Sequence, residues 1–171
     1  NTEYTFSIGN CLENNNATGF AAQPAGAFAD SVGGYGRFWS CSGEQPTELS
    51  VLRLSYNLPN VAFEMLAPDA VASVRCVRDE EELVDGYACP GMPTVTDVDG
   101  NVYHTILVGN QCWMRENLRT THYADYTAIS QDAAMTDSIA SYYQPDVEES
   151  EISLYGLQYN WLAVDNDAQN L

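Results

Sequence analysis

Residues 97–118 read DVDGNVYHTILVGNQCWMRENL and combine regular hydrophobic alternation with two turn signals. Asp99-Gly100 supplies the positive φ that a tight hairpin loop needs, so a strand is predicted over residues 102–108. Gly109-Asn110 predicts a second turn, followed by a short strand that starts at Gln111. One face of this meander must be covered by another layer, because such strands are not stable alone.

Other segments of the chain also favour strands. The predicted strands cover residues 3–8, 35–41, 49–56, 61–66 and 73–77, and residues 154–164 fit a short strand or turn. Residues 131–143 are ambiguous and fit a short helix that Pro145 ends. The close spacing of the strands predicts an α+β fold that is mainly antiparallel β.

The composition limits the class of partner. The chain has 171 residues, 45% of them hydrophobic, which is enough for a core. Its net charge is −18, and its six basic residues are all arginine, which argues against nucleic acid or an anionic membrane as a partner. The chain is not expected to span a membrane, because no stretch approaches about 20 apolar residues. Five cysteines favour an oxidising location, either secreted or at the cell surface.

Two motifs in the second half point to a known family. Residues 97–123 fit the pattern DxDGNxYxTxxxGxQxWMxENLRTTxY, and residues 155–161 read YGLQYNW. Together they resemble the opening of the Fibrobacter succinogenes major paralogous domain, which is abundant in secreted proteins of Bacteroidetes and Fibrobacteres. The resemblance implies a repeat with a fold like that of C-type lectins and formylglycine-generating enzymes.

The first half resembles the closing part of the same domain. Residues 34–40 read GYGRFWS, and residues 72–79 read ASVRCVRD, close to the usual family ending GFSVRCVRD. The resemblance therefore implies two partial domains. Residues 1–79 form the C-terminal portion of one repeat, residues 80–89 an acidic linker, and residues 90–171 the N-terminal portion of the next repeat.

Candidate metal chemistry is confined to one turn. Asp97, Asp99 and Asn101 alternate as in the beginning of a calcium loop, but the twelfth position, where a glutamate is needed, holds Val108. A hairpin turn is therefore favoured over a calcium site, and calcium is the only cofactor considered. The sequence has neither the Gly-x-Ser-x-Gly elbow of a serine nucleophile nor a Cys-His pair with local support. The catalytic cysteine pattern of formylglycine-generating enzymes is not matched either. The chain is therefore predicted not to be an enzyme.

The cysteines allow two disulfides and leave one thiol. Cys89 and Cys112 flank the central hairpin and are predicted to pair. Cys11 and Cys41 both depart from the family pattern and form the second predicted pair. The resemblance implies that, in a complete repeat, Cys76 pairs with a cysteine in a later segment that opens Cys-Pro-x-Gly-Trp-His. Cys76 is therefore expected to form an intermolecular disulfide, or else to be buried and free.

Two hypotheses for function follow. The first is an extracellular structural subunit of a surface filament, because half-domains with open strand edges need partners, which copies of the same chain can supply head-to-tail. The second is a secreted carbohydrate-binding or adhesive lectin-like module that binds glycans through exposed aromatic rings. Its candidate residues are Trp39, Trp113, Tyr155, Tyr159 and Trp161, although tryptophan in strand patterns is more often part of the core.

Two further readings stay open. In a third arrangement the two halves fold on each other as one permuted domain, which predicts a monomer without unpaired edges. Short Asp-Ser-hydrophobic patterns at Ser31 and Ser138 resemble O-glycosylation sites of Bacteroidetes.

Overall fold

The computed structural model describes residues 19–26, 32–40, 49–55, 58, 61–79, 87–131, 139–165 and 171. Within these ranges the chain forms eleven strands, one 3-10 helix and two α-helices. The first five strands are β1 (Tyr35–Trp39), β2 (Leu49–Ser55), β3 (Ala62–Leu66), β4 (Val71–Ser73) and β5 (Val77–Asp79). The others are β6 (Thr94–Thr96), β7 (Val102–Val108), β8 (Gln111–Met114), β9 (Ser130–Gln131), β10 (Ser141–Tyr143) and β11 (Gln158–Asn160). The helices are η1 (Glu149–Glu151), α2 (Ile152–Tyr155) and α3 (Trp161–Val164).

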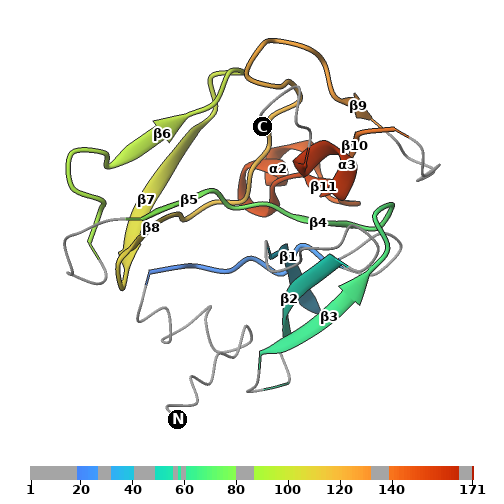
Figure 1. Ribbon diagram of the computed structural model, residues 1–171, viewed down its shortest axis with the longest axis horizontal. Coiled ribbons are helices and arrows are strands. Elements are labelled where there is room, and N and C mark those ends of the chain that lie inside the picture. The colour runs from blue at the N-terminus through green and yellow to red at the C-terminus, as the bar shows by residue number, and fades with distance from the viewer. Residues whose placement is uncertain are drawn as a thin grey trace.

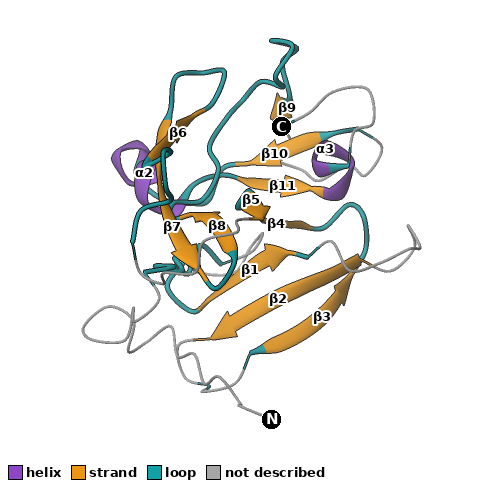
Figure 2. Cartoon of the chain, turned by 60° about the vertical axis from the view of Figure 1, so that its left-hand side comes forward, coloured by secondary structure: helices purple, strands orange, loops and turns teal. Residues whose placement is uncertain are grey.

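The strands form two sheets (Figures 1 and 2). The larger sheet has the order β3-β2-β1-β4-β11-β10-β9, and the smaller one has the order β5-β8-β7-β6. All neighbours are antiparallel except β1 with β4 and β9 with β10. The prediction of a β-rich, mainly antiparallel fold is therefore confirmed.

The central hairpins form as the turn residues predict. Gly100 has φ of 84° and Gly109 has φ of 61°, so each turn uses the left-handed backbone region that glycine adopts without strain. The first turn joins β6 to β7, and the second joins β7 to β8. Local turn chemistry is thus sufficient to set the register of this meander.

Strand β7 is covered on both faces over its second half. Tyr103, Thr105 and Leu107 are buried on one face. Ile106, on the other face, is also buried, and a Cβ atom added to Gly19 would lie 2.8 Å from its Cγ1 atom. The segment that starts at Gly19 therefore covers the second face of β7, which the alternation alone does not reveal.

The N-terminal hairpin of the larger sheet is also confirmed. Strands β2 and β3 pair with Leu52 opposite Phe63, and β1 pairs with the other edge of β2. The single strand predicted over residues 73–77 is wrong. Instead, β4 ends at Ser73 in the larger sheet and β5 begins at Val77 in the smaller one, so the chain changes sheets between them.

The C-terminal region differs from its prediction in detail. Residues 154–164 contain the end of α2, then β11 and then α3, whose N-cap is Asn160, with its side chain accepting a hydrogen bond from the Ala163 backbone. Within the ambiguous segment 131–143, the described ends belong to strands β9 and β10. The helix predicted there otherwise falls on residues 132–138, outside the described ranges, as does the strand predicted over residues 3–8.

The two halves of the sequence do not form separate sheets. Strand β4 of the first half pairs with β11 of the second half, and β5 pairs with β8. Both sheets therefore contain strands from each side of residues 80–89. None of the helices in the described ranges has the length and apolar character needed to cross a membrane.

Candidate functional site at the junction of the two halves

The junction is built around β4, a three-residue strand in the interior of the larger sheet. Its neighbour on one side is β1, and its neighbour on the other side is β11. Ala72 lies opposite Tyr159, and both residues are fully buried. Each half therefore supplies the strand that closes the open edge of the other half.

A tryptophan connects the halves next to this strand pair. The indole nitrogen of Trp39 donates a hydrogen bond of 2.8 Å to the backbone oxygen of Tyr159. The Tyr159 hydroxyl in turn donates to the backbone oxygen of Thr120 at 2.7 Å. Burial raises the pKa of Tyr159 well above its ordinary value, so this hydroxyl remains a donor at any physiological pH.

Gln158 makes a second connection from β11. Its side-chain nitrogen donates to the backbone oxygens of Ala25 at 3.2 Å and Gly26 at 2.8 Å. The Gln158 side chain is buried, so these bonds satisfy a donor that has no access to water. The motif YGLQYNW thus places two side chains, those of Gln158 and Tyr159, against the first half.

Arg75 and Asn117 form a buried polar pair across the junction. The Arg75 Nε donates to Asn117 Oδ1 at 2.8 Å, and its terminal nitrogens donate to the backbone oxygens of Phe20 and Ala21. The guanidinium also lies over the rings of Phe20 and Phe38. Burial lowers the pKa of Arg75 to about 9, which leaves the group charged at neutral pH. Among the described residues, no carboxylate forms an ion pair with it.

Asn117 distributes its hydrogen bonds over both halves. Its amide nitrogen donates to the Tyr155 backbone oxygen at 2.8 Å and to the Ser73 hydroxyl at 3.3 Å. The side chain is buried, and its amide oxygen accepts from Arg75, so both ends of the amide have partners. The sequence prediction missed Arg75, Asn117 and Gln158 as junction residues. The only sequence signal for these three residues is that each lies inside one of the family motifs quoted above.

The candidate calcium residues lie in the β6–β7 turn but face different groups. Asp97 accepts hydrogen bonds from the Asn101 backbone and side chain and from the Tyr103 hydroxyl. Asp99 instead accepts from the backbone nitrogen of Thr121 and contacts the His122 ring at 2.6 Å. Both carboxylates therefore stabilise the turn and the loop after β8, and among the described residues no cluster of three acidic, histidine or cysteine side chains suits a metal ion.

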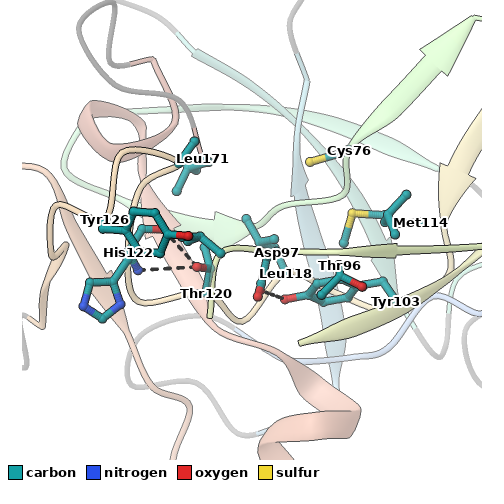
Figure 3. Close-up of a pocket in the computed structure, with 13 residues that line it drawn as sticks. Cys76, Thr96, Asp97, Tyr103, Met114, Leu118, Thr120, His122, Tyr126 and Leu171 are labelled. Carbon is teal, nitrogen blue, oxygen red and sulfur yellow. Dashed lines mark hydrogen bonds between the residues drawn. The ribbon is translucent and has the colours of Figure 1, made fainter. Parts of the chain in front are cut away.

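A cavity of about 500 Å³ opens beside this turn (Figure 3). In Figure 3 the side chains of Asp97 and Tyr103 point toward each other, while Leu171 lies on another side of the cavity. The Tyr126 ring lines the cavity and is 75% exposed. Tyr126 also has φ of 68°, a backbone conformation that is costly for a residue with a side chain.

The five aromatic residues predicted to bind sugars do not form one surface. Tyr159 is fully buried, so it offers no ring face to a sugar. Trp39 and Trp161 are edge-to-face at 5.4 Å, and Trp113 packs edge-to-face against Phe20. Tyr155 is partly buried and its backbone oxygen accepts from Asn117. The described arrangement lacks two coplanar exposed rings among these five residues.

The predicted disulfide between Cys89 and Cys112 is present, with the Cα atoms 5.8 Å apart. It joins the segment before β6 to β8. Cys76 lies beside the cavity and is free within the chain, as one of the two expectations had it, but it is exposed and not buried. The predicted Cys11–Cys41 pair and the glycosylation candidates Ser31 and Ser138 lie outside the described residues.

These contacts define a two-sheet β protein in which each sheet contains strands from both halves of the sequence. Residues 106–171 match the family model described as Fibrobacter succinogenes major domain. The match spans from the middle of β7 to the end of the chain and includes the YGLQYNW motif at the junction. No curated protein and no solved structure matches the chain.

Proposed function

We propose that the chain is an extracellular structural subunit of a surface filament, in which the N-terminal part of one copy completes the C-terminal part of the next. The observation that supports this proposal best is the position of β4 between β1 and β11. Without β11, the edge of β4 and the buried residues Val71 and Ala72 lose their cover. An uncovered interior strand of this kind would pair with any strand that fits it.

The same contacts serve within one chain or between chains. In a single copy β4 pairs with β11, and Arg75 with Asn117, across the boundary at residues 80–89. If successive copies exchange their C-terminal parts, each contact is kept but now joins two chains. In the proposed exchange each copy receives from one neighbour and donates to the next, and a chain of such contacts whose rotation does not close is a filament.

The remaining features of the proposal concern the repeat and its location. We take residues 1–79 as the closing portion of one C-type-lectin-like repeat and residues 90–171 as the opening portion of the next. The Cys89–Cys112 disulfide supports a secreted or cell-surface location, because disulfides persist in oxidising compartments. The role is non-enzymatic, which the use of Asp97, Asp99 and His122 in turn hydrogen bonds supports.

The mass of the native full-length chain under non-reducing conditions tests the filament. Light scattering and direct imaging are expected to find long polymers that denaturant shortens, whereas a species near the 18.8 kDa of one chain contradicts the proposal. That result would leave the arrangement in which one chain folds as a single permuted domain.

Trp39→Phe removes a hydrogen bond between the halves, so its polymers are expected to shorten at a lower urea concentration than those of the wild type. Trp161→Phe removes a hydrogen bond within the second half but keeps an aromatic ring against Trp39, so it serves as the matched control.

The cavity beside Tyr126 favours a second candidate, a carbohydrate-binding adhesive module. An exposed tyrosine ring supplies a stacking face for a sugar, and Thr96 and Asp97 supply polar groups in the same cavity. Calorimetric titration with cello-, xylo- and manno-oligosaccharides tests this candidate. Binding that Tyr126→Ala abolishes and Tyr87→Ala leaves unchanged would support it, because Tyr87 is similarly exposed outside the cavity. Heat signals that are equal in both variants would contradict it.

A further inference from the structure

Strand β3 ends the larger sheet and carries two exposed apolar side chains. Figure 2 shows it outside β2, away from the strands of the second half. Phe63 is 71% exposed and Met65 is 55% exposed, and their alternation places both on the same face of the strand. The cross-strand row of Phe38, Leu52 and Phe63 therefore leads from the buried core to β3, whose outer side pairs with no strand of the described residues.

On the opposite face of β3, the negative charge of Glu64 is neutralised by arginine. Glu64 forms ion pairs with Arg37 at 3.0 Å and with Arg53 at 2.7 Å. Both guanidinium groups also lie over the Tyr35 ring. Strands β1, β2 and β3 thus contain two arginines and one glutamate, whereas the whole chain carries a net charge of −18. This edge is a place where two acidic chains can approach with little local repulsion.

The sequence of β3 lacks the usual protection of an edge strand. Exposed edges are commonly blocked by lysine, proline or an unpaired inward charge. The strand reads AFEML, and its single charge already has two arginine partners. Nothing in the strand therefore opposes the addition of another strand.

We propose that two copies of the chain pair antiparallel along β3, about a twofold axis at Glu64. In this register Phe63 of one copy faces Met65 of the other, and the reverse pair forms on the same face. The two Glu64 carboxylates come near each other on the second face, where the four arginines of the two copies outnumber them. The edge places apolar side chains opposite apolar side chains on one face and keeps an arginine excess around Glu64 on the other, and these features favour a second copy as the occupant.

The contact is independent of the proposed exchange between the halves. It uses the end of the sheet farthest from β11, so a copy can form both contacts at once. In a filament the β3 pair would join two filaments side by side. In the absence of exchange it would produce a discrete dimer.

Sedimentation equilibrium of the full-length chain and four variants tests the pairing. F63K and M65E each place a charge at the contact and are expected to raise the dissociation constant at least about tenfold. The double variant F63K/M65E is expected to recover pairing, because in the twofold register the introduced lysine of one copy faces the introduced glutamate of the other. V102K adds the same charge at a residue of β7 that is 48% exposed, so pairing is expected to be unchanged.

Each outcome bears on one contact or the other. A two-chain species that F63K converts to single chains supports the β3 pair and contradicts the filament. Polymers of unchanged width in F63K overturn the β3 pair and leave the exchange proposal standing. A wild-type chain that stays single at all concentrations overturns both. A double variant that folds but does not regain pairing overturns the twofold register.

Pairing should also strengthen as salt is added, because salt screens the repulsion between the two acidic chains.

Discussion

At the scale of single residues, the junction depends on Arg75. This side chain is buried and joins Asn117 of the second half to the Phe20 and Ala21 backbone of the first. Arg75→Met keeps most of the volume but leaves these acceptors without a donor, so we expect a loss of about 3 kcal/mol of unfolding free energy. Urea denaturation measures the loss. Arg78→Met, at an exposed position, is the control, and equal losses in both variants would contradict the assigned role.

Gly156 is a second critical residue, because the chain passes very close to Asn117 there. Its φ is 72° and its ψ is −171°, a conformation restricted to glycine. An added Cβ would lie 2.5 Å from the Asn117 Cβ. Gly156→Ala is therefore expected to cost at least about 3 kcal/mol, measured by thermal or urea unfolding. Gly109→Ala also has positive φ but meets open space, so about 1 kcal/mol is expected, and a similar cost for both would refute the close approach.

Asp99 gives the turn a pH dependence. Partial burial acts to raise the pKa of this carboxyl, but hydrogen bonds from the Thr121 backbone and the Thr120, His122 and Thr121 side chains hold it below the ordinary value of 3.8. Its contribution is therefore fully present above pH 3.8 and is lost as the pH falls through the lowered pKa. Asp99→Asn should be less stable than wild type at pH 7, and the difference should shrink below pH 3.8.

Urea midpoints at neutral and acidic pH measure this difference. Asp146→Asn removes the same charge from an exposed position, so it separates the local hydrogen bonds from the reduction in total charge. A difference between Asp99→Asn and wild type that does not change with pH would show that the carboxylate form of Asp99 is not the stabilising species.

At the scale of elements, the Cys89–Cys112 disulfide fixes the start of the smaller sheet. It closes a loop with a sequence separation of 23 that contains β6 and β7. Replacing both cysteines by serine is expected to lower the unfolding free energy by about 3 kcal/mol, chiefly because the unfolded chain gains freedom. Non-reducing urea denaturation measures this loss. Equal stability of the variant and the oxidised chain would contradict it.

The elements predicted from sequence are those that local chemistry determines. Asp99-Gly100 and Gly109-Asn110 predict their hairpins correctly, because the turn residues carry the backbone geometry within two positions. The change of sheet between Ser73 and Val77 could not be predicted, because β4 and β5 have three residues each and their partners come from the other half. Tyr159 of YGLQYNW packs in a core cluster with Tyr103 and Leu118, and the local sequence does not identify these partners.

At the scale of the whole molecule, two sheets cross the boundary between the partial repeats. The match of residues 106–171 to a family model does not specify where the partner strands come from. The structure supplies β4 and β5 as those partners. The larger sheet consequently has its buried junction in the middle and an open edge at β3, and these two features carry the two proposals for assembly.

Amide hydrogen exchange of the native full-length chain tests the pairing of the halves most directly, because it reports β4 and β11 whether they pair within one chain or between chains. The account predicts that the amides of residues 71–73 and 158–160 exchange as slowly as those of β7 and far more slowly than those of residues 147–151. Fast exchange at β4 and β11 in a sample whose β2 and β7 amides remain protected would contradict it, since each half would then fold without the other.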